Sequence, residues 1–245
     1  MQYFFDTVET IVPGVGFQLY GREHITWLMV FVLFAIGSSI LYRKQTKETR
    51  RKMQVLFAAL IVGNELFKMT CLTIGGNYRL DYLPLHLCSI NIILIAVHVL
   101  KPSEALDNFL YMVCIPGAMV ALLFPSWTEL PRINFMYWHS FTVHILLATY
   151  PIMLTSGGDI KPKAKKIPQS FLILGGLATL AFCFNVLFDT NFMFLMYAEE
   201  GNPLLIFEEL FGRHWVGFPI IIAGILVVMY TIPLKFFRKI NNNLQ

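Results

Sequence analysis

Charged residues are scarce in this chain of 245 residues: Asp, Glu, Lys and Arg together make up 14%, whereas 56% of the residues are hydrophobic. With a mean hydropathy of +0.62 the chain is too apolar for a soluble domain. Several apolar runs are long enough to cross bilayer hydrocarbon. The composition therefore predicts a polytopic membrane protein, and its net charge of +4 gives no indication of nucleic-acid binding.

Cysteine is also sparse, and the chain has no C-x-x-C pair and no zinc-finger spacing. Its four cysteines lie within or at the edges of apolar runs, at Cys71, Cys88, Cys114 and Cys183. We therefore expect neither a disulfide scaffold nor a metal site. Residues 1–23 are acidic and broken, without a basic n-region, so a cleavable signal peptide is not expected.

Signatures of common enzyme classes are missing as well. The sequence has no G-x-S-x-G elbow, no H-E-x-x-H motif and no glycine-rich phosphate loop. These absences argue against serine-hydrolase, metalloprotease and nucleotide-dependent chemistry. We expect no cofactor.

Seven apolar segments predict an all-α fold, a membrane helix bundle forming a single integral membrane domain over residues 1–245. The expected transmembrane helices are 25–43, 53–74, 81–100, 107–125, 133–153, 169–188 and 216–235.

Basic residues are concentrated in three segments, 43–52, 161–166 and 235–239. An even number of predicted spans separates these segments, so all three fall on the same side of the membrane. The positive-inside rule assigns that side to the cytoplasm. We therefore expect an extracytoplasmic N terminus and a cytoplasmic C terminus, in a multi-pass membrane protein.

The outer segment 190–214 contains signals for a short helix. Asn202 and Pro203 suit an N-cap and a first turn, and Gly212 suits a C-terminal stop. The sequence predicts a short helix lying on the outer surface.

Polar side chains lie at similar depths inside the apolar segments. Counted at 1.5 Å per residue, Cys88 is about 10–12 Å below the outer end of segment 81–100. The same count places His139 and His144 at about 9 and 16 Å, and Lys68 and Glu65 at about 10 and 15 Å. Intramembrane polar groups usually bind ligands, relay protons or react, so this layer is the expected functional site.

A thiol and an imidazole are the groups needed for acyl transfer through a thioester, because a histidine can deprotonate the nucleophilic cysteine. His86 is about 200° from Cys88 around a helix, so the partner should come from another segment. His139 and His144 are about 140° apart on segment 133–153, so only one of them faces Cys88. Their spacing does not decide which one.

Seven further residues are candidates for substrate binding, although several also have a structural explanation. Glu65 and Lys68 suit an ion pair, His86 a hydrogen bond to a neighbouring helix, and Asp189 and Asn191 a cap on segment 169–188. Asn91, Ser140 or a backbone amide near Pro84 would serve as oxyanion donors. The candidates are His86, Glu65, Lys68, Asn91, Ser140, Asp189 and Asn191.

Three motifs resemble the TMEM164-related family of integral membrane proteins and, within it, the bacterial YwaF-like group. They are L-H-L-C at 85–88, F-M-Y-W-H-S-F-T-V-H at 135–144 and D-T-N-F-M-F-L at 189–195. The resemblance implies an intramembrane acyltransferase acting on a phospholipid or lysolipid, with a cysteine nucleophile and a histidine base. Carried over to this chain, these residues are Cys88 and His144, with His139 as the other candidate base.

Other functions remain open on the sequence alone. With water as the acceptor, the same site would hydrolyse a lipid ester. The Glu65 and Lys68 pair and the prolines Pro116 and Pro151 would also suit a transporter or ligand-binding protein, and a structural or sensory membrane module is a third class. The sequence does not indicate an oligomeric state.

Overall fold

The computed structural model describes residues 2–198 and 202–242, with side chains described up to residue 230. Regular structure in these ranges is helical throughout, without a strand. The nine α-helices of the described residues are α1 (Arg22–Arg43), α2 (Lys47–Ile74), α3 (Leu87–Leu100), α4 (Glu104–Phe109), α5 (Ile115–Leu123), α6 (Phe135–Gly157), α7 (Ile167–Phe188), α8 (Leu204–Phe211) and α9 (Gly217–Asn242).

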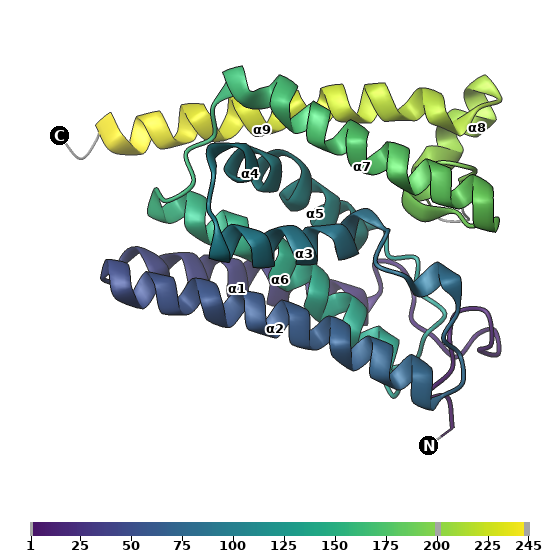
Figure 1. Ribbon diagram of the computed structural model, residues 1–245. Coiled ribbons are helices and arrows are strands. Elements are labelled where there is room, and N and C mark those ends of the chain that lie inside the picture. The colour runs from purple at the N-terminus through teal and green to yellow at the C-terminus, as the bar shows by residue number, and fades with distance from the viewer. Residues whose placement is uncertain (1, 199–201, 243–245) are drawn as a thin grey trace.

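Helix α6 forms the centre of the bundle. It packs against α1, α2, α3 and α5, while α7 and α9 lie across α4 and the turn that follows it (Figure 1). Tyr150, Phe141 and Leu147 of α6 are fully buried. Because the neighbouring helices shield α6 from its surroundings, this helix can carry imidazoles and hydroxyls without exposing them to lipid.

Each of the seven predicted segments contains a helix, but fewer are long and apolar enough to span a membrane. Within the described residues, four helical stretches meet this standard, namely α1, α2, the run from α4 through α5, and α7 with its preceding turn. A fifth results if α8 and the helix after it, which meet at 115°, form one broken span. The structure therefore supports several membrane-spanning helices and leaves the count of seven unconfirmed.

The predicted boundary of segment 81–100 is wrong at its first residues. Helix α3 begins only at Leu87 and has 14 residues, about 21 Å of helix, which is shorter than bilayer hydrocarbon. Ahead of it lie a 3₁₀ turn, Leu80–Tyr82, and a non-helical segment, 83–86, in which the amide of Leu85 donates to the carbonyl oxygen of Leu83 at 2.7 Å. Leu83 has ψ 150° because the following Pro84 disfavours the helical conformation.

The two prolines that would suit a transporter, Pro116 and Pro151, do not break their helices. Pro116 lies in the first turn of α5, after a π-helical turn at Leu110–Cys114 that connects α4 to α5 without a break. Pro151 lies inside α6, which continues to Gly157. Neither proline therefore opens a gap in its helix.

The predicted short helix after α7 is confirmed as α8. The side-chain oxygen of Asn202 accepts a hydrogen bond from the amide of Leu204 at 2.9 Å. Gly212 ends the helix with a positive φ of 69°, a conformation that glycine adopts without a steric penalty.

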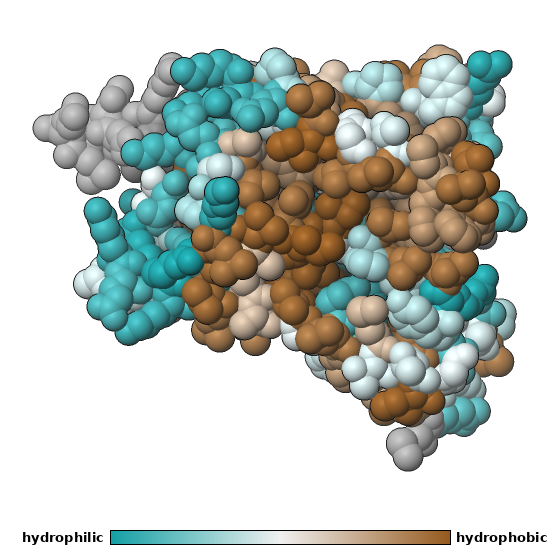
Figure 2. Space-filling view, in the orientation of Figure 1, coloured by the Kyte–Doolittle hydropathy of each residue, from teal (hydrophilic) through white to brown (hydrophobic). Residues whose placement is uncertain are grey.

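The basic segments come together at one end of the bundle. Arg50, near the start of α2, donates to the carbonyl oxygen of Gly157 at 2.9 Å and lies 3.4 Å from Asp159. Figure 2 shows hydrophilic residues gathered at this end, next to a broad hydrophobic belt. The turn after α1 and the loop after α6 therefore share a side, as the spacing of the predicted spans required.

Candidate active site

Cys88 lies in the first turn of α3, directly after the non-helical segment 83–86. His86 is the N-cap residue, with φ −67° and ψ 149°, and its side chain does not cap the helix. In the part of the chain that the structure describes, the amides of Leu87, Cys88 and Ser89 donate to no acceptor. Free N–H groups at a helix start favour negative charge, so this position suits a reactive thiol.

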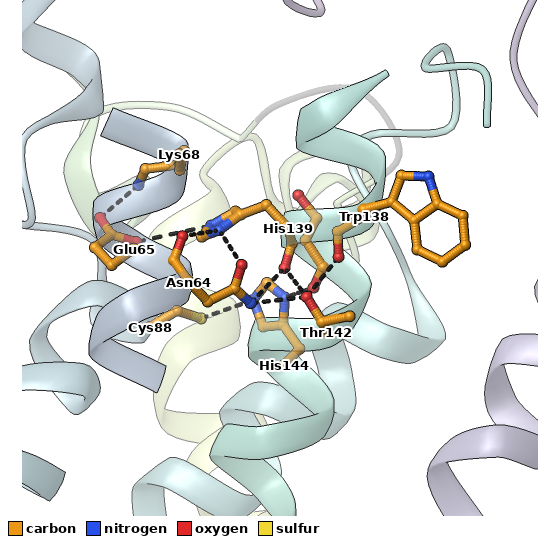
Figure 3. Close-up of polar contacts among 9 residues, drawn as sticks. Asn64, Glu65, Lys68, Cys88, Trp138, His139, Thr142 and His144 are labelled. Carbon is orange, nitrogen blue, oxygen red and sulfur yellow. Dashed lines mark hydrogen bonds and ion pairs between the residues drawn. The ribbon is translucent and has the colours of Figure 1, made fainter. Parts of the chain in front are cut away.

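The thiol of Cys88 meets the imidazole of His144 from α6, with 3.2 Å between Sγ and Nε2 (Figure 3). The other ring nitrogen, Nδ1, lies 2.6 Å from the carbonyl oxygen of Ser140. A carbonyl oxygen only accepts, so in the neutral ring Nδ1 carries the proton and Nε2 presents its lone pair to the thiol. The contact therefore joins a nucleophile to an oriented base.

Trp127 holds the imidazole from its face. The two rings are stacked, with centroids 5.2 Å apart and an angle of 9° between their planes. Trp127 is 5% exposed and belongs to the loop between α5 and α6. Sequence analysis missed this residue, since a tryptophan in an interhelical loop carries no periodic signal.

His139, the other candidate base, is turned away from the thiol. Its Nδ1 lies 3.1 Å from the carbonyl oxygen and 3.2 Å from Oδ1 of Asn64 on α2. Its Nε2 lies 3.7 Å from Oε2 of Glu65. His139 therefore joins α6 to α2, and Asn64 is a second residue that sequence analysis missed.

Glu65 and Lys68 form the ion pair expected from their spacing. Nζ of Lys68 lies 2.6 Å from Oε1 of Glu65, and their side chains are 9% and 10% exposed, respectively. The second carboxylate oxygen, Oε2, accepts no hydrogen bond within the described residues. Figure 3 shows this pair on α2, close to the two histidines.

Three other residues expected to bind substrate, His86, Asn91 and Ser140, lie near the thiol and differ in their contacts. The ring of His86 meets Phe192 edge-on, with centroids 4.9 Å apart. Asn91, one helical turn after Cys88, is 2% exposed, and its Oδ1 has no partner among the described residues. Ser140 contributes its backbone carbonyl to His144.

The outer loop accounts for the remaining candidates. Asn191 is engaged with the loop backbone, donating to the carbonyl oxygen of Tyr197 at 3.0 Å and accepting from the amide of Met196 at 3.1 Å. Asp189 is the exposed C-cap of α7, with φ 54°. The expectation that Asp189 and Asn191 line the site with Cys88 therefore finds no support, because one side chain is exposed and the other braces its own loop.

The start of α3 also changes the depth argument, because segment 81–86 is not helical. The depth of the pair follows instead from α6, where His144 lies nine residues after Phe135, about 14 Å along the helix. Glu65 lies nine residues before the end of α2, again about 14 Å. The polar layer predicted from the sequence is therefore present, just inside the half of α6 nearer its first residue.

The described residues contain no cluster of three or more His, Cys, Asp or Glu side chains suited to a metal ion. All four cysteines are free thiols. The arrangement offers one thiol paired with one base, and the Cys88 residue is partly exposed.

Comparison with protein-family models gives one match, to the model described as the TMEM164 family, over residues 19–232. This range includes Cys88, His144 and every helix from α1 to α8. Comparison with curated proteins and with solved structures gives no match.

Proposed function

The chain belongs to the TMEM164 family, and from this membership and the geometry around Cys88 we propose that it is an intramembrane lipid acyltransferase. Cys88 carries the acyl group as a thioester, and His144 is the base. The contact between Cys88 Sγ and His144 Nε2 is the observation on which the proposal rests.

The first half-reaction loads the enzyme. Nε2 of His144 takes the proton of the Cys88 thiol, and the thiolate attacks the carbonyl carbon of a phospholipid ester. The tetrahedral intermediate collapses as its C–O bond breaks, and His144 returns the proton to the leaving alcohol, a lysolipid. The acyl group remains on Sγ.

The second half-reaction reverses these roles. His144 takes the proton of an acceptor lysolipid hydroxyl, whose oxygen attacks the thioester carbonyl. The C–S bond breaks, and the proton passes through His144 to the sulfur. The free amides of Cys88 and Ser89 at the start of α3 would donate hydrogen bonds to the oxyanion of the reacting carbonyl. In other enzymes, removal of one such donor lowers the rate by about 10²–10³.

The non-helical segment before α3, residues 83–86, gives this chemistry a place within the membrane. Non-helical backbone at membrane depth is tolerated where it is buried in protein or lines a wet cavity. Residues 83–88 are partly exposed, whereas Ser89 to Ile92 are buried. We propose that a lipid ester approaches Cys88 laterally along this stretch.

The wider assignment follows the charge distribution. We propose seven membrane-spanning helices in a single domain, with the N terminus outside, the basic end in the cytoplasm and the site in the outer half of a bacterial plasma membrane, as for a YwaF-like member of the family. The short length of α3 fits this count if the non-helical segment 83–86 completes the crossing inside the protein.

The test is to trap the acyl-enzyme. The purified protein is incubated with a phospholipid carrying a labelled acyl chain, denatured, and mapped by mass spectrometry. We expect a hydroxylamine-sensitive acyl group on Cys88 that is absent from the Cys88→Ser variant. The control variant is Cys114→Ser, which should retain the acyl group, because the thiol of Cys114 is buried and lies 3.4 Å from the carbonyl oxygen of Leu147. An unlabelled Cys88, or equal turnover by Cys88→Ser, would refute the mechanism.

The choice of acceptor separates transferase from hydrolase. Release of the label onto an added lysolipid supports acyl transfer, whereas release only to water identifies a lipid ester hydrolase. The buried Glu65 and Lys68 pair is the observation that favours a ligand-binding or transport protein instead. That alternative predicts an inert Cys88 and specific binding lost on Glu65→Gln.

A further inference from the structure

A second feature lies at the opposite end of the bundle from Cys88. There the structure has an open cavity of about 470 Å³ between the start of α2, the α3–α4 connection and the loop after α6. Ligand sites commonly have volumes of about 300–1,000 Å³, so this cavity exceeds the needs of a single small ion. Its lining comprises Lys47, Arg50, Arg51, Gln54, Pro102 and Asp159.

The three cations of this cavity differ in how far their hydrogen bonds are satisfied. Arg50 is fixed by protein acceptors, since its guanidinium donates to the carbonyl oxygens of Tyr42, Arg43 and Gly157. The side chain of Lys47 makes no hydrogen bond or ion pair with any described residue. Arg51 makes a single long contact, 3.4 Å from Nη1 to Oε1 of Gln54. Two cations thus face the cavity with donors to spare.

The carboxylate in the lining does not neutralise these two cations. Asp159 accepts a hydrogen bond from Tyr42 at 2.6 Å and lies 3.4 Å from Arg50, so it is engaged on the fixed side of the cavity. The amides of Lys47 and Glu48 also open the 28-residue helix α2 here, at the positive end of its dipole. The local field therefore favours a multivalent anion.

We propose that this cavity binds the phosphate group of an anionic ligand, with Lys47 and Arg51 as its principal contacts. Arginine and lysine donors match phosphate oxygens, and the arginine fork can bind two of them at once. The remaining volume of the cavity can hold part of the molecule that carries the phosphate group. Figure 2 shows that the hydrophilic end of the bundle adjoins the hydrophobic belt, so either a lipid headgroup or a soluble phosphate can reach this end.

Neighbouring basic residues provide a matched pair of variants. Arg51→Gln and Lys52→Gln each remove one positive charge, at adjacent positions of α2. Only Arg51 lines the cavity, whereas Lys52 is 73% exposed and paired with Glu48 at 2.7 Å. Neither residue is needed for packing, so both variants should fold. Comparing them separates a built site from general attraction between a basic surface and anions.

The experiment uses two probes on the full-length protein in detergent. Native mass spectrometry measures retention of phosphatidylglycerol against phosphatidylcholine, and thermal unfolding measures stabilisation by inorganic phosphate. We expect Arg51→Gln, and separately Lys47→Gln, to weaken binding about tenfold, the loss of one charge-assisted hydrogen bond. Lys52→Gln should bind like the original protein.

The two probes then assign the source of the phosphate. Variant-sensitive retention of phosphatidylglycerol alone identifies a lipid headgroup, and variant-sensitive stabilisation by inorganic phosphate identifies a soluble ligand. Equal loss in Arg51→Gln and Lys52→Gln, or no preference for either phosphate probe, would overturn the proposal. Neither variant touches Cys88 or His144, so acyl loading of Cys88 remains a separate measurement.

Discussion

Two histidines five residues apart on α6 show how single hydrogen bonds assign different roles to the same side chain. Both direct Nδ1 at a carbonyl oxygen, His144 at Ser140 and His139 at Asn64. The difference lies at Nε2, which meets a thiol in His144 and a carboxylate in His139. The two positions are about 140° apart around the helix, so His144 faces the thiol of Cys88 whereas His139 contacts α2.

We therefore predict that His144→Gln slows acyl loading of Cys88 by about 10²–10⁴, the usual contribution of a general base. His139→Gln should affect stability more than loading, because it removes a bridge between α6 and α2. Single-turnover thioester formation measures the first effect and thermal unfolding the second. Equal loading defects in the two variants would contradict this division.

Trp127 is predicted to act as a positioning residue for His144. Trp127→Phe retains an aromatic face, whereas Trp127→Leu removes the stack. An aromatic pair is worth about 0.5–1.5 kcal/mol, so loading should fall about two- to tenfold in the leucine variant. Single-turnover loading should be close to normal in Trp127→Phe and reduced in Trp127→Leu. Equal defects in both variants would argue for loss of folding alone.

At the scale of elements, the loop after α7 is held in an unusual conformation. Asp189, Met193 and Phe194 all have positive φ values, and each such residue costs about 1–3 kcal/mol. Asn185 offsets part of this strain, since it donates to the carbonyl oxygen of Phe192 at 3.0 Å and accepts from the Phe192 amide at 2.8 Å. Phe192 is thereby placed against His86, the N-cap residue of α3.

Asn185→Leu is accordingly predicted to destabilise the protein by about 2–4 kcal/mol, through lost hydrogen bonds and newly unpaired buried groups. Limited proteolysis should cut within residues 190–197 before any other described loop. As a contrast, Met193→Gly relieves a positive φ and should not lower the unfolding temperature. If Asn185→Leu leaves both protease resistance and unfolding temperature unchanged, the loop is held by something else.

The N-terminal segment is tied to the turn that precedes α3 through Glu9, whose Oε2 accepts a hydrogen bond from Tyr82 at 3.0 Å. Burial raises the pKa of Glu9, but hydrogen bonds from Thr7, its own backbone and Tyr82, with the charge of Arg79, outweigh burial and lower the pKa. A lowered carboxyl pKa stabilises the fold above the unfolded-state value, and this contribution is lost as the pH falls through the folded-state value.

We expect amide hydrogen exchange in residues 7–11 and 80–83 to quicken, relative to the intrinsic rate, as the pH falls below about 4.5. Glu9→Gln should show weaker protection at neutral pH and little further change on acidification. Identical pH dependence in the two proteins would remove Glu9 from this role.

At the scale of the whole molecule, the sequence predicted the positions of the helices better than the contacts between their side chains. Apolar runs located a helix in each of the seven segments, and Asn202 with Gly212 predicted α8, because these signals are local. The start of α3 was misplaced, since hydrophobicity continues through residues 83–86 while Pro84 keeps Leu83 out of the helical conformation. Contacts between Cys88 and His144, or between Asn64 and His139, depend on helix rotation and packing, which spacing along one chain leaves open.

Clustering of the basic segments leads to the last prediction, the orientation of the bundle. Arg50 joins the turn after α1 to the loop after α6, so these segments must face the same compartment, which the positive-inside rule makes the cytoplasm. Lys165→Cys and Glu129→Cys, in a Cys183→Ser background, place a thiol at each end. An impermeant maleimide applied to intact cells should label the cysteine at 129 and reach that at 165 only after permeabilisation. The reverse pattern would put the basic end outside and move Cys88 to the inner half of the membrane, where it would meet the lipids of the opposite leaflet.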